Sequence, residues 1–197
     1  MPNLHDQFGP IDIYLFDQLL KGRILPGMCV LDAGCGGGRN LVYLLREGYP
    51  VFGVDVDPRA VADVRQLARH LPAENFRVER VEEMSFPDDF ADVVLSSAVL
   101  HFARDDDQFQ AMLRGSWRVL KPGGLFFCRL ASEIGMEGRF QQIAGRRFRL
   151  LDGSERYLVD EEMLLRWTAE LSGRLVDPLK TTVVQGQRCM TTWVVRK

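Results

Sequence analysis

The sequence has few residues of the kinds that bind metals or form disulfides. Its four cysteines, Cys29, Cys35, Cys128 and Cys189, are scattered without a Cys-x-x-Cys pair, and its three histidines do not cluster. Closely spaced cysteines are typical of zinc and redox sites, and a dense even set is typical of a disulfide-linked secreted domain. The sequence therefore favours neither, and we predict no metal.

Long apolar runs and an excess of one charge are also lacking. No apolar run approaches the roughly 18 residues of a membrane-spanning helix, and residues 1–6 lack the basic and apolar regions of a signal peptide. A net charge of −2 gives no support for a nucleic-acid-binding surface. We expect a cytoplasmic protein without membrane or nucleic-acid partners, and the sequence leaves its oligomeric state open.

The composition of the 197 residues is ordinary, with 46% hydrophobic and 26% charged residues. A chain of this length can bury a substantial core, so we predict one domain. Within it, the pattern separates an N-terminal helical segment (1–27), a ligand-binding core (28–131), a candidate substrate lid (132–159) and a closing helix with a hairpin (160–197).

A glycine-rich stretch organises the core. Residues 28–31 predict a buried strand, which continues through Asp32 into the glycine run 34–38, and residues 39–47 predict a helix. A strand, a glycine turn and a helix in this order let the backbone approach a nucleotide-like ligand closely. Glycines suit such a turn because they accept positive φ and have no side chain in the way.

Two features of this turn argue against a dinucleotide site. The fingerprint of such sites has a third glycine where this chain has Arg39, and the carboxylate of Asp32 would repel a pyrophosphate. A cationic or zwitterionic ligand would tolerate Asp32. A nicotinamide-dependent oxidoreductase is therefore the less favoured alternative, and it stays open.

Strands and helices alternate through the rest of the core. Strand-like runs at 51–55, 76–81, 92–97 and 125–128 are separated by helical patterns, and a helix from Asp160 precedes two closing strands at 181–184 and 190–195. Asp57 and Pro58 are typical of a helix start. Alternation of this kind predicts an α/β fold with helices on both faces of a mostly parallel sheet.

The N-terminal segment carries a further helical pattern. Ile13, Phe16, Leu19 and Leu20 are apolar at roughly helical spacing and predict a helix that packs on the sheet. If this helix also covers the ligand, Tyr14 is a candidate substrate contact.

These motifs together resemble class I S-adenosylmethionine-dependent methyltransferases. The resemblance rests on the D-x-G-x-G-x-G pattern of 32–38, on Asp55 at the end of the second strand, on the stretch 84–88 and on the Leu-Lys-Pro-Gly-Gly turn of 120–124. In finer detail, residues 38–40, 43–44, 48–49 and 99–102 look most like small tellurite-resistance-type methyltransferases.

The resemblance implies a Rossmann-like, seven-stranded methyltransferase sheet, mostly parallel with an antiparallel last strand, and S-adenosyl-L-methionine as cofactor. Asp55 would accept hydrogen bonds from the ribose hydroxyls. Arg80 stands where the family has an aspartate for the adenine amino group, so Glu82 or Glu83 would serve instead. The residues that we predict to contact the cofactor are Asp32, Gly34, Cys35, Gly36, Gly38, Arg39, Asp55, Val56, Val81, Glu82 and Ser97.

The predicted function is methyl transfer to an unidentified small-molecule acceptor by in-line displacement. His101 is the candidate general base, and a purely structural histidine is the alternative at this position. His101, Tyr14 and Arg139 are the candidate substrate contacts. The mixture of glycines, Phe140 and arginines in 132–159 suggests a mobile substrate cover. A non-catalytic cofactor-binding or partner-binding module of the same fold would carry the same cofactor residues.

Overall fold

Five parallel strands form the central part of the fold in this computed structural model, which describes residues 3–197. They are β1 (Val30–Ala33), β2 (Val51–Asp55), β3 (Phe76–Val78), β4 (Ala91–Ser97) and β5 (Leu120–Ser132). The last strand, β11 (Arg188–Arg196), runs antiparallel along β5. Its other edge is shared by two short strands, β9 (Arg174–Leu175) and β10 (Lys180–Val184).

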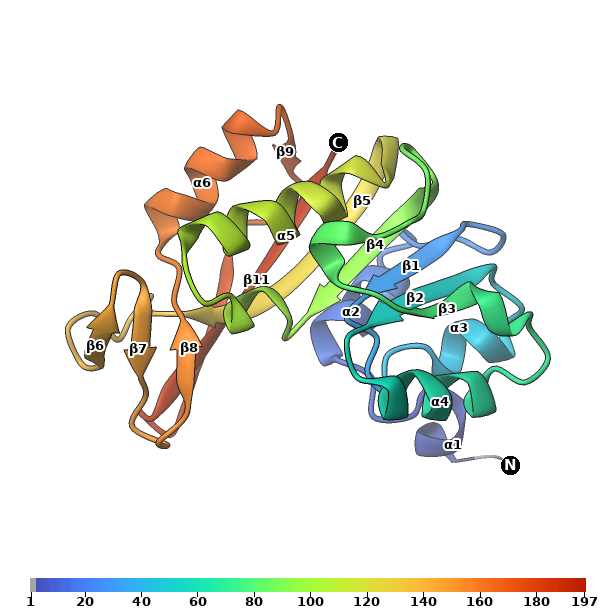
Figure 1. Cartoon of the computed structure of the whole chain (residues 1–197), viewed down its shortest axis with the longest axis horizontal. Helices are drawn as coiled ribbons and strands as arrows, with labels where there is room; N and C mark the ends of the chain where they lie inside the picture. The colour runs from blue at the N-terminus through green and yellow to red at the C-terminus, as the bar shows by residue number, and fades with distance from the viewer. Residues whose placement is uncertain (1–2) are drawn as a thin grey trace.

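The resulting order is β10-β11-β5-β4-β1-β2-β3, with β9 beside β11 (Figure 1). Of these strands only β11 runs against the others, because β9 and β10 both pair antiparallel with it. The predicted mostly parallel sheet with an antiparallel last strand is confirmed. The first strand begins at Val30, two residues later than predicted.

Helices cover both faces of the sheet. On one face, apolar residues of α5 (Asp106–Arg118) and α6 (Glu161–Glu170) pack against side chains such as Leu31 and Trp193. On the other face, α2 (Ile13–Leu20), α3 (Val42–Arg46) and α4 (Pro58–Leu67) pack against side chains such as Val30 and Val194. The neighbours Val30 and Leu31 point to opposite faces, as the two-residue period of a strand requires.

Two helices near the N-terminus differ from the prediction. A short helix, α1 (Leu4–Phe8), was not predicted, and residues 1–2 of the predicted N-terminal segment lie outside the described part. The predicted helix forms as α2 and packs on the sheet, but two of its four predicted apolar positions, Ile13 and Leu20, are 71% and 72% exposed. The buried positions of α2 are Leu15 and Gln18. The Gln18 amide donates a hydrogen bond to Asp177. A polar residue therefore occupies the inward face of α2 and interrupts the apolar pattern in the sequence.

The helix after the glycine turn is also shorter than predicted. Residues 39–41 remain in the turn, and α3 covers only Val42–Arg46. By contrast, α4 begins as predicted, with Asp57 accepting a hydrogen bond from the Arg59 N–H and Pro58 as its first residue.

Residues 132–159 form a separate lobe beside the main sheet (Figure 1). Three short antiparallel strands build it, β6 (Gln141–Ala144), β7 (Arg147–Arg149) and β8 (Glu155–Tyr157). A small apolar cluster that includes Met136, Phe140 and Leu150 fixes the lobe to the end of β5. No alternation of buried and exposed residues marks β6, because this strand is exposed along its whole length.

Within residues 3–197, the helices are all too short or too polar to traverse a lipid bilayer.

Candidate functional site

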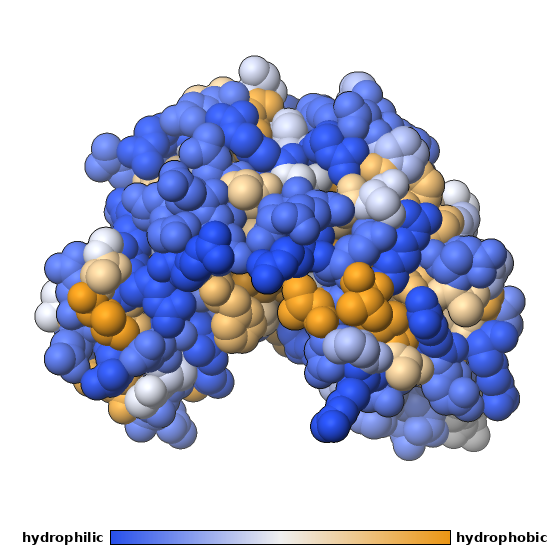
Figure 2. Space-filling model, in the orientation of Figure 1, coloured by the Kyte–Doolittle hydropathy of each residue, from blue (hydrophilic) through white to orange (hydrophobic). Residues whose placement is uncertain are grey.

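A cavity of about 920 Å³ opens at the carboxyl ends of β1, β2 and β4. Open α/β sheets bind their ligands at this edge. The surface is hollowed between the lobe of β6–β8 and the part that carries α4, and apolar side chains gather along the hollow (Figure 2). A cavity of this volume is large enough for a nucleoside-sized ligand.

The glycine turn after β1 forms one wall of the cavity. Gly34 has φ +98°, and a Cβ on it would lie 2.3 Å from Val99 Cγ2, so only glycine fits there. Gly36 has φ +50°, and a Cβ there would meet nothing within 4 Å. The first glycine thus allows close packing against the segment after β4, and the second leaves bare backbone facing the cavity.

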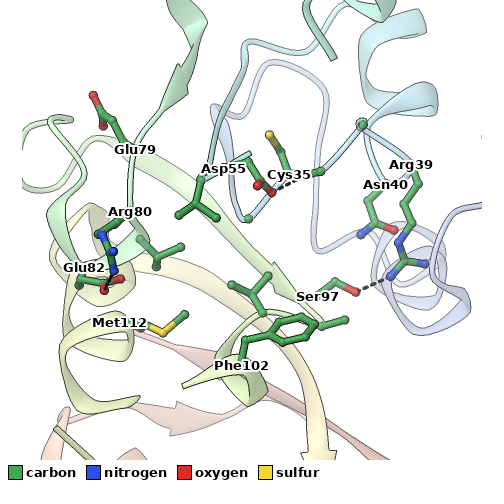
Figure 3. A pocket seen from close by; sticks show the side chains of 18 of the residues that line it. Cys35, Arg39, Asn40, Asp55, Glu79, Arg80, Glu82, Ser97, Phe102 and Met112 are labelled. Atoms are coloured by element: carbon green, nitrogen blue, oxygen red, sulfur yellow. Dashed lines mark hydrogen bonds and ion pairs between the residues drawn. The ribbon is translucent and has the colours of Figure 1, made fainter. Parts of the chain in front are cut away.

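Asp55, at the end of β2, binds the backbone of the glycine turn through its carboxylate. Its Oδ2 accepts a hydrogen bond from the Gly36 N–H at 2.9 Å, and its Oδ1 accepts one from the Asp57 N–H at 2.9 Å. Each carboxylate oxygen has a further lone pair, so Asp55 can still accept hydrogen bonds from a ligand. The side chain lines the cavity (Figure 3).

Asp32 lies beneath the turn and does not line the cavity. It is 2% exposed, and its Oδ1 has no hydrogen-bond partner among the described residues. Burial raises the pKa of this carboxyl to about 7, against the opposing effect of the Arg39 guanidinium. A buried carboxylate with an unused acceptor fits a positively charged ligand above it and disfavours a pyrophosphate.

Arg39 and Ser97 join the two sides of the cavity floor. Arg39 Nη2 donates a hydrogen bond to Ser97 Oγ at 3.1 Å (Figure 3). Next to them, the buried Asn40 accepts a hydrogen bond from the Asp12 N–H at 3.0 Å, which attaches the segment before α2 to the cavity wall.

The far wall contains the acidic residue that could replace the missing aspartate. Glu82 Oε1 accepts a hydrogen bond from Gln108 Nε2 at 3.0 Å and one from Arg80 Nη1 at 3.5 Å. Arg80 therefore contacts Glu82, and Glu82 is the residue left to accept a hydrogen bond from an adenine amino group. Glu79 also lines this wall, but its carboxylate is bonded to the N–H and hydroxyl of Ser85.

A second cavity of about 290 Å³ adjoins the first, and Ala98 and Phe102 line both. Ala98 has φ +65°, a strained conformation for a residue other than glycine, and its N–H donates to the Arg129 carbonyl oxygen at 2.7 Å. Strained backbone of this kind gathers at functional sites. The Phe102 side chain is 58% exposed between the two cavities.

His101 lies at the second cavity, and its geometry argues against the predicted role as general base. The ring is 4% exposed, and Nδ1 accepts a hydrogen bond from the Ala131 N–H at 3.1 Å. Burial, together with the nearby guanidinium groups of Arg156, Arg129 and Arg188, lowers the pKa of His101 to about 3. The ring is therefore neutral with its proton at Nε2, and it presents a donor where a base needs an acceptor.

Of the eleven predicted cofactor residues, all but Asp32 line the large cavity. The thiol of Cys35 is buried and its pKa is raised by burial, so it is no nucleophile. Tyr14 and Arg139 line neither cavity in the described part of the chain. The Tyr14 hydroxyl bonds to Thr182 Oγ1 at 2.5 Å, and Arg139 is an exposed residue before β6.

Several lining residues were not among the predicted contacts, and the signal that the sequence offers differs among them. Asn40 lies in the motif stretch 38–40, so the sequence could have indicated it. Gln108 and Met112 of α5 project from a helix whose acidic start and apolar stripe have ordinary structural explanations. Phe102 directly follows His101, which is a predicted substrate contact, so the sequence could have indicated it as well.

Comparison with known proteins finds methyltransferases among the similar sequences. Residues 31–128 match the family described as a methyltransferase domain. An uncharacterized methyltransferase of Synechocystis sp. is 37% identical over 103 residues, which are 52% of this chain and 47% of that protein. The chain spans about half the length of the curated relatives it matches.

Solved structures match over nearly the whole chain. A structure of an S-adenosylmethionine-dependent methyltransferase from Methanosarcina mazei covers 91% of this chain and 96% of its own, with a TM-score of 0.72 and 20% identity. The 1,6-didemethyltoxoflavin-N1-methyltransferase of Burkholderia thailandensis, with bound 1,6-didemethyltoxoflavin and S-adenosylhomocysteine, covers 96% of this chain and 79% of its own (TM-score 0.70, 20% identity). At this level of identity the likeness establishes the fold.

Proposed function

Since residues 31–128 match the methyltransferase-domain family and the chain has the fold of S-adenosylmethionine-dependent methyltransferases, we propose that this protein methylates a small molecule. The large cavity would hold S-adenosylmethionine, and the second cavity would hold the acceptor. One observation carries the proposal most directly. The glycine turn, Asp55 and Glu82 line one cavity, and that cavity adjoins a smaller one at Ala98 and Phe102.

The lining residues fit this cofactor. The bare backbone at Gly36 admits a close ligand, and the free lone pairs of Asp55 suit a pair of hydroxyl groups. The unpaired Oδ1 of Asp32 suits a cofactor that carries positive charge and disfavours one that carries a pyrophosphate. When bound, S-adenosylmethionine supplies a methyl group on a positively charged sulfur that leaves readily, so the protein need not activate it.

The work left to the chain is positioning and exclusion of water. Phe102 and Ala98 lie where the two cavities meet, so they would hold the acceptor against the cofactor. His101 keeps its proton at Nε2 and would orient the acceptor by donating a hydrogen bond. No described residue of the second cavity is placed to remove a proton, so the acceptor would bring a soft or already ionised nucleophile.

A test separates this proposal from its alternatives. Calorimetric titration of the full chain should show binding of S-adenosylhomocysteine and no binding of NADH. Binding of NADH alone would favour the oxidoreductase. Incubation with S-adenosylmethionine carrying a labelled methyl group and a panel of small acceptors should then label an acceptor. Binding without any transfer across the panel would favour the non-catalytic module.

The predicted division of the chain remains part of this proposal. Leu150, Ser154 and Arg156, all from the predicted lid 132–159, line the second cavity, which supports a role for that lobe in covering the acceptor. The resemblance of residues 38–40 and 99–102 to tellurite-resistance-type methyltransferases stays a prediction. It would be tested by offering chalcogen oxyanions as acceptors.

A further inference from the structure

The second cavity has a charge of one sign. Three arginines line it, Arg129, Arg156 and Arg188, and no described acidic residue does. They come from β5, β8 and β11, so strands far apart in the sequence meet there. His101 also lines this cavity, and its neutral ring adds no charge.

The three guanidinium groups differ in how far they are already neutralised. Arg129 pairs with the buried carboxylate of Asp12 at 2.9 Å. Arg188 lies 3.7 Å from Asp152, too far for a hydrogen bond. Arg156 has no acidic partner within ion-pairing distance among residues 3–197, and the bond recorded for its Nη1 goes to the Glu155 carbonyl oxygen at 2.7 Å. Arg156 therefore keeps both its charge and most of its donors for a ligand.

Part of the surroundings of Arg156 is apolar. Its guanidinium carbon lies 4.8 Å from the centroid of the Phe102 ring, and Leu150, Ala131 and Met190 line the same cavity. A cation beside an aromatic ring and an apolar wall suits a small ligand with one flat apolar part and one anionic part. The volume of about 290 Å³ limits the apolar part to about one ring.

We propose that the second cavity binds a small organic anion, whose carboxylate or phosphate group is held by Arg156 and Arg188. This inference rests on the proposed function in treating the bound anion as the methyl acceptor. It agrees with a neutral His101 that donates from Nε2, because a donor suits an anion. Where the ionised oxygen is itself the nucleophile, it would form a bond to the methyl carbon as the carbon–sulfur bond breaks and S-adenosylhomocysteine leaves, so no proton has to be removed.

The test uses two matched pairs of probes, benzoate with benzamide and phenyl phosphate with phenol. Each is titrated calorimetrically into the full chain, with and without saturating S-adenosylhomocysteine. We expect at least one anion to bind at least tenfold more tightly than its neutral partner, and the pair that does so identifies carboxylate or phosphate. Arg156→Gln should abolish the preference, and Arg156→Lys should restore part of it.

Two controls separate this result from other effects. Arg166→Gln removes the same charge from the exposed face of α6 and should leave the preference unchanged. The affinity for S-adenosylhomocysteine should be the same in Arg156→Gln and the wild type, which shows that the variant is folded. Absence of an anion preference in both pairs, or a preference that survives Arg156→Gln, overturns the proposal. Failure of S-adenosylhomocysteine to bind while the anion preference persists overturns the proposed function and leaves the anion site standing.

Discussion

Asp12 and Arg129 form an ion pair that links the segment before α2 to β5. Asp12 Oδ2 lies 2.9 Å from Arg129 Nη1, and the Asp12 side chain is 1% exposed. The same aspartate donates its N–H to Asn40 at the large cavity, whereas Arg129 lines the second. The guanidinium also lies 5.3 Å from the Tyr14 ring centroid. One buried pair therefore connects the N-terminal segment with both cavities.

Removing one partner of this pair should be costly. Asp12→Ala leaves the Arg129 charge unpaired, and we expect the free energy of unfolding to fall by up to the roughly 3–5 kcal/mol of a fully buried pair. Arg129 is 21% exposed, which places the result toward the lower end. Urea unfolding would measure it. The double variant Asp12→Ala/Arg129→Ala should lose less than the sum of the single changes. Additive losses would show that the two side chains do not interact.

The close approach of Gly34 to Val99 predicts a second stability effect. Gly34→Ala combines a positive φ with a Cβ 2.3 Å from Val99 Cγ2, so we expect a loss of about 2–4 kcal/mol from strain and overpacking together. Gly123→Ala is the matched control, because φ is +76° there and a Cβ meets nothing within 4 Å. Its cost should be about 1 kcal/mol. Equal losses in the two variants would mean that the contact with Val99 relaxes freely.

The position of Asp55 predicts an effect on ligand affinity. Asp55→Ala removes the proposed acceptor for the ribose hydroxyls and frees the Gly36 N–H, so S-adenosylhomocysteine should bind at least tenfold more weakly. Hydrogen bonds to charged groups contribute about 1.5–3 kcal/mol each. Asp107→Ala, an exposed carboxylate in the first turn of α5, should leave the affinity unchanged. Calorimetric titration measures both, and an unaffected Asp55→Ala protein would contradict the assigned site.

The raised pKa of Asp32 predicts a pH effect on stability. Burial holds the folded-state pKa of Asp32 at about 7, above the ordinary value of 3.8 for an exposed aspartate. Between these values the folded chain binds more protons than the unfolded chain, so the contribution to stability falls as the pH rises from about 4 to 7. The slope approaches about 1.4 kcal/mol per pH unit. Asp32→Asn should flatten this part of the urea-unfolding profile, and an unchanged profile would refute the assignment.

The lobe of residues 132–159 predicts a change in dynamics. If it covers the acceptor, its amides should exchange more slowly with solvent when S-adenosylhomocysteine and an anionic probe are both present. Hydrogen exchange followed by mass spectrometry would show this in peptides from β7 and β8. Peptides from α6 serve as the internal control. Protection in 132–159 that does not respond to either ligand would exclude a covering role.

The sequence predicted those parts of the fold whose signal is local. The glycine turn, the carboxylate at the end of β2 and the cap of α4 each follow from a few neighbouring residues, and they lie where expected. The burial of Gln18 does not follow from its neighbours, because its partner Asp177 is 159 residues away along the chain. The surroundings of His101 were hidden for the same reason, since the backbone N–H that occupies its Nδ1 belongs to Ala131.

The place of β11 has a consequence for the order in which the molecule assembles. This strand lies between β5 and the pair β9 and β10, although it follows all of them in the chain. Until it is synthesised, β5 has an unpaired edge, and unpaired edges invite association with other chains. Arg188, which lines the smaller cavity, belongs to the same strand. A nascent chain can therefore complete its glycine turn early, but the smaller cavity forms last, when the sheet closes.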